Sequence, residues 1–190
     1  MKVKPSQTPG GVVVELNSQD EKLLEKSTQA GVPFKLRKIL VPVDFSGCSK
    51  KALQYAIPFA KQFNASLTLL YVVQLDYAYG EFGAVDYPAL EKEMRESGEK
   101  KLAELAEEEI EEALLATTLV KSGRPVTEIV EAARKLDIDL IIMSTHGHTG
   151  LKHVFLGSTT ENVVRYAPCP VLTVREHEHE FVIPKPHQIS

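Results

Sequence analysis

The sequence predicts one α/β domain built on a doubly wound, five-stranded parallel sheet. From Lys38 onward, short runs of β-branched and apolar residues alternate with segments whose apolar residues recur every three or four positions. That alternation is typical of parallel strands joined by helices, and such connections are almost always right-handed. A length of 190 residues, 43% of them hydrophobic, suits one well-buried core and is short for two.

The first predicted strand, residues 38–44, is nearly continuous in apolar residues, as expected when helices cover both faces of a sheet. A helix follows, with apolar residues at helical spacing up to Phe63, Ser49 as its expected N-cap and Pro58 as a candidate kink. Residues 66–73 form the second predicted strand.

The next connection, residues 74–88, carries four aromatic residues. It is either a flap over a ligand or a loop packed on its own domain or on a second subunit. The remaining predicted elements are a long helix over 89–115 with Leu90 on its inner face, a strand over 117–121, a helix from Pro125 to Leu136, a strand over 139–144, a helix over 158–166 and a strand over 171–174.

Both ends of the chain depart from this repeat. We predict an N-terminal extension over residues 1–36, with a strand at 12–16 and a short helix at 20–29 ended by Gly31. The predicted domain covers residues 37–175, and residues 176–190 are expected to be a flexible tail.

Composition argues against several classes of partner. The formal net charge is −4, without the clusters of Lys and Arg that hold nucleic-acid backbones, so we expect no nucleic-acid partner. No apolar run is long enough to span a bilayer, and the start of the chain lacks a secretion signal. We therefore expect no membrane association and a cytoplasmic protein in which Cys48 and Cys169 stay reduced.

The stretch from Met143 to Asn162 carries the most chemical information. Glycines at 147 and 150 let the backbone bend close to an anion, and Gly157 precedes a predicted helix that opens with two hydroxyl residues. Free amides and the partial positive charge at a helix start form a phosphate site. On spacing alone, a glycine-rich turn with Ser158 as a simple N-cap explains the pattern equally well.

Histidines at 146, 148 and 153, and a second group at 177 and 179, raise the question of a metal site. No cysteine or carboxylate set completes a recognisable ligand spacing, so we expect no structural metal. Magnesium carried by the phosphates of a nucleotide is the more consistent interpretation. His146 is then either a donor toward phosphate or a histidine packed in the turn.

Three segments together resemble the universal stress protein family: residues 38–53, the glycine-rich stretch, and residues 167–175. The resemblance covers about residues 36–175. It implies an adenine nucleotide alpha hydrolase-like fold with strand order 3-2-1-4-5, usually a dimer, and it points to the branch of the family that binds ATP.

The motif of that branch is glycine, two residues, glycine, nine residues, glycine, then Ser or Thr. Here Gly147, Gly157 and Ser158 match it, whereas Ser144 stands in place of the first glycine. A side chain therefore occupies a position where the family usually leaves room.

Carried over residue by residue, the resemblance implies that Asp44 lies near the ribose or a metal-bound water and that Gly123 lines the adenine side. The chemistry of Asp44 agrees, because a carboxylate at a strand end can accept bonds from ribose hydroxyls. Its alternative role is helix capping or a turn bond to backbone amides. The implied nucleotide-binding residues are Pro42, Val43, Asp44, Gly123, Met143, Ser144, His146, Gly147, Gly150, Gly157, Ser158 and Thr159.

The residues and the resemblance together favour an ATP-binding stress-response or regulatory module with at most slow ATP hydrolysis or autophosphorylation. The resemblance also implies a dimer, for which residues 171–174 are the expected pairing edge. The alternative is a nucleotide-independent dimeric interaction protein of the same fold, which Ser144 favours. Adenylating or pyrophosphatase enzymes and dinucleotide oxidoreductases are disfavoured, because neither a glycine- and serine-rich phosphate loop nor G-x-G-x-x-G follows the first strand.

Overall fold

The computed structural model describes residues 2–5, 12–15, 35–74, 86–111, 114–145 and 157–175. The chain divides into two compact units, Met1–Lys35 and Leu36–Ser190. In the first unit, strands β1 (Lys2–Pro5) and β2 (Val12–Glu15) pair antiparallel, with Val3 opposite Val14. β2 coincides with the strand predicted at 12–16, whereas β1 was not predicted. The helix predicted at 20–29 lies outside the described residues.

The second unit holds a five-stranded sheet in the order β5-β4-β3-β6-β7, and every neighbouring pair in it is parallel. This order confirms the predicted 3-2-1-4-5 topology. Its strands are β3 (Lys38–Val43), β4 (Ser66–Val73), β5 (Ala116–Ser122), β6 (Leu140–Ser144) and β7 (Val171–Val174). Its helices are α2 (Gly47–Phe63), α3 (Tyr87–Glu109), α4 (Pro125–Lys135) and α5 (Ser158–Tyr166). Of the described helices, none is both long and apolar enough to cross a membrane.

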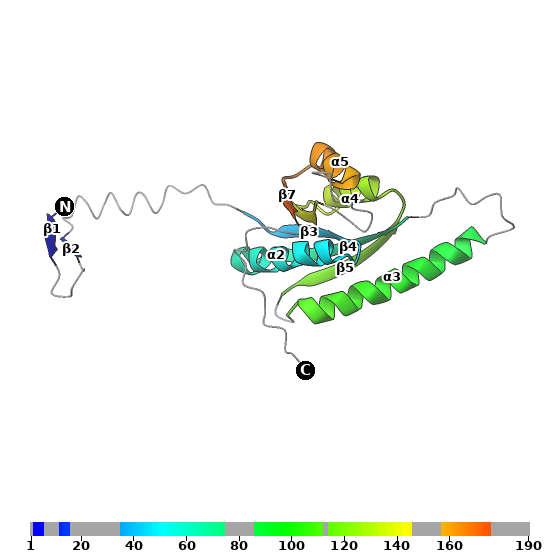
Figure 1. Cartoon of the computed structure of the whole chain (residues 1–190), viewed down its shortest axis with the longest axis horizontal. Helices are drawn as coiled ribbons and strands as arrows, with labels where there is room; N and C mark the ends of the chain where they lie inside the picture. The colour runs from blue at the N-terminus through cyan, green and yellow to red at the C-terminus, as the bar shows by residue number, and fades with distance from the viewer. Residues whose placement is uncertain are drawn as a thin grey trace. The chain divides into compact units, whose positions relative to one another are not determined.

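Helices cover both faces of this sheet, with α2 and α3 on one side and α4 and α5 on the other (Figure 1). Successive residues of a strand point to opposite faces, so β3 contributes to both cores. Ile39 and Val41 are fully buried against α2 and α3, whereas Leu40 is fully buried on the face of α4 and α5. Burial on both faces explains the nearly continuous apolar runs in these strands.

The predicted start of α2 was wrong by one helical turn. Its N-cap is Ser46, whose side-chain oxygen accepts a hydrogen bond from the Ser49 amide at 3.2 Å. Ser49 lies inside the first turn and is buried. The helix then continues through Pro58 as far as Phe63.

The predicted bounds of the long helix, 89–115, were also wrong at both ends. α3 begins at Tyr87 because Asp86 caps it, accepting a bond from the Ala89 amide at 3.1 Å. It ends at Glu109 because Ile110 adopts an extended conformation. Leu90, predicted on the inner face, is 38% exposed, since the buried part of α3 runs from Gly98 to Leu105.

α3 comes very close to the sheet at Gly98. A Cβ atom at this position would lie 2.6 and 2.7 Å from two ring carbons of Tyr71 on β4. The Tyr71 ring in turn packs on Phe45, with 4.8 Å between ring centroids. Gly98 therefore lets α3, Tyr71 and the segment that follows β3 pack together.

Candidate functional site

The candidate site lies where the chain order of the sheet reverses, between β3 and β6. From β3 the chain proceeds outward to β4 and β5, then returns to place β6 and β7 on the other side. Leu40 pairs with Ile141, and continuing this register along both strands brings Val43 level with Ser144. In doubly wound sheets, ligands bind outside the carboxyl ends of the strands at this reversal.

Asp44 follows β3 and forms a tight turn with the start of α2. Its Oδ1 atom accepts hydrogen bonds from the Ser46 amide at 3.0 Å and from the Ser46 hydroxyl at 2.5 Å. Phe45, between them, has a left-handed φ of 64°, which is uncommon for an aromatic residue. The turn role that the sequence left open for Asp44 is therefore present in the structure.

The start of α5 is tied to the end of β6 by two hydrogen bonds. The Gly157 amide donates to the carbonyl of Thr145 at 2.8 Å, and the Thr160 hydroxyl donates to the carbonyl of Ser144 at 2.9 Å. Thr145 and Thr160 are both buried. The first turn of α5 is thus fixed at the carboxyl edge of the sheet.

This helix start has no side-chain cap. The N-cap is Gly157, not Ser158 as the alternative interpretation of the sequence had it, and Ser158 is the first helical residue. The first helical amide bond runs from Glu161 to the Gly157 carbonyl, so the amides of residues 158–160 precede the helical ladder. No backbone acceptor for these three amides is found within the described ranges. Such a helix start presents hydrogen-bond donors and partial positive charge to an anion.

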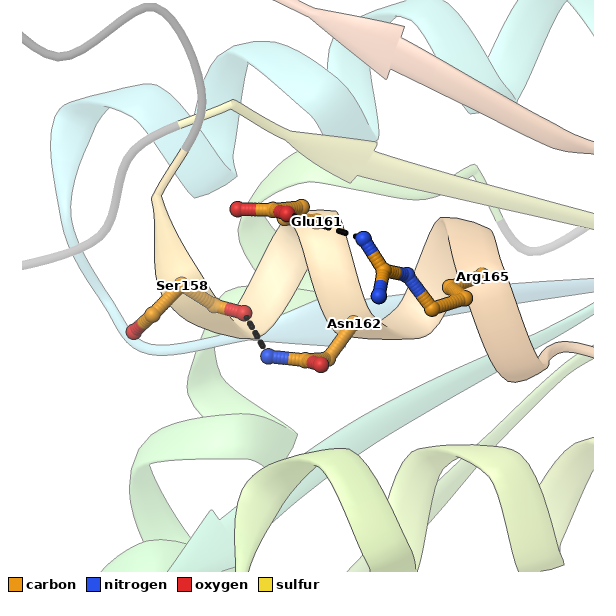
Figure 2. A network of polar contacts seen from close by, with 4 residues as sticks. All are labelled: Ser158, Glu161, Asn162 and Arg165. Atoms are coloured by element: carbon orange, nitrogen blue, oxygen red, sulfur yellow. Dashed lines mark hydrogen bonds and ion pairs between the residues drawn. The ribbon is translucent and has the colours of Figure 1, made fainter.

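Two polar contacts run along α5, from Asn162 to Ser158 and from Arg165 to Glu161 (Figure 2). The Ser158 hydroxyl points away from the rest of the helix, while its carbonyl accepts a bond from Asn162 Nδ2 at 2.8 Å. Glu161 is the acidic residue of the first turn, and Arg165 binds its carboxylate at 3.3 Å. This pairing offsets the negative charge nearest the helix start.

Gly123 ends β5 at the same edge of the sheet. Its φ of 148° lies in a region that favours glycine, and its amide donates to the carbonyl of Val73 at 3.0 Å. A Cβ atom here would lie 2.8 Å from the Glu128 carboxylate. Two strands separate Gly123 from β6, so a ligand touching both Gly123 and α5 would lie across the ends of β4 and β3.

Several predicted site residues have buried or partly buried side chains. The side chain of Val43 is buried against α2 and α3, and that of Met143 against α4 and α5. Ser144 is 8% exposed, and Pro42 is half-buried. His146, Gly147 and Gly150 lie outside the described residues, as do the other clustered histidines. Across the described ranges, no three His, Cys, Asp or Glu side chains form a group able to hold a metal ion.

Sequence reasoning missed three residues that shape the site: Ser46, Thr145 and Thr160. Ser46 was detectable, because Asp-x-Ser before a helix is a common turn and capping pattern. Thr145 and Thr160 hold α5 to β6 through long-range bonds that no local pattern signals.

Comparisons with known proteins agree on one family. A model described as the universal stress protein family matches residues 35–175. Universal stress protein MJ0531 of Methanocaldococcus jannaschii is 35% identical over 144 residues, which is 76% of this chain and 85% of that protein.

Solved structures share the fold. Protein MJ0577 of the same organism matches with a TM-score of 0.67 at 30% identity, covering 77% of this chain and 100% of that one. A universal stress protein of Archaeoglobus fulgidus, solved in complex with dAMP, has the same fold at 17% identity and a TM-score of 0.52, covering 74% of this chain and 98% of that one.

Proposed function

Because this chain belongs to the universal stress protein family, we propose that it binds ATP at the carboxyl edge of its sheet and acts as a dimeric stress-response module. The observation that carries the proposal is the start of α5, which has no side-chain cap and is held against β6 beside the end of β3. The dAMP complex shows an adenine nucleotide bound by one protein with this fold.

In this proposal the phosphates bind at α5. The amides of residues 158–160 donate to phosphate oxygens, and the Ser158 hydroxyl adds a neutral donor. Gly157, Ser158 and Thr159 are the binding residues there, together with the stretch 146–150. Magnesium enters with the phosphates, because it prefers phosphate oxygens and water to an all-protein cage.

The adenosine then lies across the ends of β3 and β4. Asp44 accepts bonds from the ribose hydroxyls, the backbone of Pro42 and Val43 contacts the adenosine, and Gly123 lines the adenine side. Contacts of this kind bind and orient a nucleotide without activating a water molecule or a nucleophile. We therefore expect at most slow ATP hydrolysis or autophosphorylation.

The dimer forms in this proposal through β7. β7 is an edge strand, because within the described sheet it pairs only with β6. Val171, Leu172 and Thr173 are half-buried, which leaves apolar surface and backbone groups along this edge. Analytical ultracentrifugation at micromolar concentration tests this directly, since a monomer contradicts the dimer.

We place the protein in the cytoplasm, where ATP is plentiful and Cys48 and Cys169 stay reduced.

Calorimetric titration with Mg-ATP tests the nucleotide proposal, with Ser158→Glu as the diagnostic variant. A carboxylate in the first turn is favourable for the helix but repels phosphate, so the fold is retained while ATP affinity falls at least tenfold. Ala89→Glu is the matched control, because it adds the same charge at the exposed start of α3. Absence of binding by the wild type, or equal binding by Ser158→Glu, contradicts the proposal.

The second candidate is a nucleotide-independent dimeric interaction protein. Ser144 favours it, because a buried hydroxymethyl group stands where the family motif has a glycine. Mass spectrometry of nucleotide released from freshly purified protein separates the two candidates. If the protein releases no nucleotide and Mg-ATP does not raise its melting temperature, the interaction module is the correct candidate.

A further inference from the structure

The hydrogen bonds around Asp44 connect it to α2 at both its backbone and its side chain. Ser46 donates twice to Oδ1, and the Ser46 hydroxyl in turn accepts a bond from the Ser49 amide at 3.2 Å. The Ser49 hydroxyl donates to the Ser46 carbonyl at 3.0 Å and accepts from the Asp44 amide at 3.4 Å. Asp44, Ser46 and Ser49 therefore form one connected polar network.

Phe45 folds the chain so that this network can close. Its left-handed backbone turns the Ser46 amide back toward the Asp44 carboxylate. Residues held in this conformation persist only when their surroundings compensate for the strain. Here the Phe45 ring packs on Tyr71, and the two bonds from Ser46 close the turn.

The Ser46 hydroxyl has two separate roles in this arrangement. As an acceptor it caps α2, a role that Asp or Asn fills equally well. As a donor it holds the Asp44 carboxylate in one orientation, which an aspartate at position 46 cannot do. Capping alone therefore does not account for the geometry around Asp44.

We propose that Ser46 is a positioning residue that fixes the Asp44 carboxylate for binding the ribose hydroxyls of the nucleotide. The proposal rests on the proposed function, because it assigns Asp44 to the ribose. A carboxylate that is already oriented loses less freedom when the ligand binds, so binding is tighter. Ser46 itself does not touch the ligand.

The experiment measures affinity for three ligands: Mg-ATP, Mg-2′,3′-dideoxy-ATP, which lacks the ribose hydroxyls, and inorganic tripolyphosphate. Ser46→Asp keeps the cap and the amide bond to Asp44, but its side chain cannot donate to Asp44 and adds a like charge. It should bind ATP about tenfold more weakly than the wild type, with much smaller losses for the other two ligands. Ser46→Thr keeps both roles and should restore ATP affinity to within about twofold.

Asp86→Gly is the control, because it removes the equivalent cap from α3 and should leave all three affinities unchanged. Equal losses for ATP and dideoxy-ATP in Ser46→Asp, or failure of Ser46→Thr to rescue, overturn the positioning role. A wild type that binds none of the three ligands overturns the proposed function instead.

A ligand-free crystal structure of Ser46→Asp tests the positioning role without any measurement of binding. The proposal expects the Asp44 carboxylate to rotate away while α2 still begins at Gly47. An unmoved carboxylate contradicts the positioning role whether or not the protein binds ATP.

Discussion

Replacing Gly98 with alanine should destabilise the domain by about 1 kcal/mol, because the new methyl group collides with the Tyr71 ring. The Cβ atom would lie 2.6 Å from Cδ1 and 2.7 Å from Cε1, and ordinary contact begins at 3.4 Å. The ring must therefore recede by about 0.8 Å, yet Phe45 packs against it.

Two terms of opposite sign set this magnitude. Forcing an extra methyl group into a packed core costs about 1–3 kcal/mol. Alanine is about 0.5–1 kcal/mol better than glycine inside a helix. The difference leaves a net loss of about 1 kcal/mol, which lowers the melting temperature by about 3 °C for a domain of this size.

Urea denaturation followed by circular dichroism measures the effect, with Gly47→Ala as the matched control. Gly47 lies in the first turn of α2, and apart from its chain neighbours and the backbone of its own helix, no atom of the described residues lies within 4 Å of a Cβ built there. Gly47→Ala should therefore be neutral or stabilising by up to about 1 kcal/mol. If Gly98→Ala is as stable as Gly47→Ala, the close approach of α3 to Tyr71 is not a constraint and the reasoning fails.

Three further predictions concern the backbone at Gly123, the charge at Glu161 and the half-buried thiol of Cys169. Gly123→Ala should lower the free energy of unfolding, measured by urea denaturation, by about 1–3 kcal/mol. Adding Glu128→Ala removes the clash but should recover only part of this loss, because the φ of 148° still penalises alanine. Full recovery would show that only the clash matters. Arg165→Ala leaves the Glu161 carboxylate unpaired in the first turn of α5 and should weaken ATP binding about twofold in calorimetry. Adding Glu161→Gln should restore the affinity, and continued weak binding would rule out this charge effect. Burial, followed by the charge of a nearby aspartate, raises the pKa of the Cys169 thiol. Iodoacetamide should therefore alkylate it more slowly at pH 8 than it alkylates a cysteine peptide, as followed by mass spectrometry. The folded protein holds that proton more tightly than the unfolded chain does, so this group's contribution to stability should fall as the pH rises above about 8.5. Alkylation as fast as in the peptide would contradict the raised pKa.

The strands were predictable because each is a buried run of apolar residues. All five domain strands lie within two residues of their predicted bounds, and α5 was predicted at 158–166, as observed. The ends of α3 were not predictable from periodicity. Leu114 continues the apolar pattern and packs on the core, but it does so after the chain has left the helix at Ile110.

The sequence placed Asp44 after β3 and Gly157 before α5, as the structure has them, but it could not predict geometry that depends on long-range packing. Phe45 carries no sign of a left-handed backbone, so the shape of the Asp44 turn was not predicted, although the Asp-x-Ser pattern marks Ser46 as a possible N-cap. The attachment of α5 through Thr145 and Thr160 arises only once β6 and the helix are packed.

The bond between the Gly157 amide and the Thr145 carbonyl joins the two residues that flank the stretch 146–156. Thr145 directly follows β6 and Gly157 is the N-cap of α5, so this bond fixes the helix start on the sheet at the two points where an insert would be joined. Doubling the length of such an insert costs only about 0.6 kcal/mol in closure entropy. The scaffold is therefore suited to grafting, in which one fixed helix start is combined with inserts chosen for different ligands.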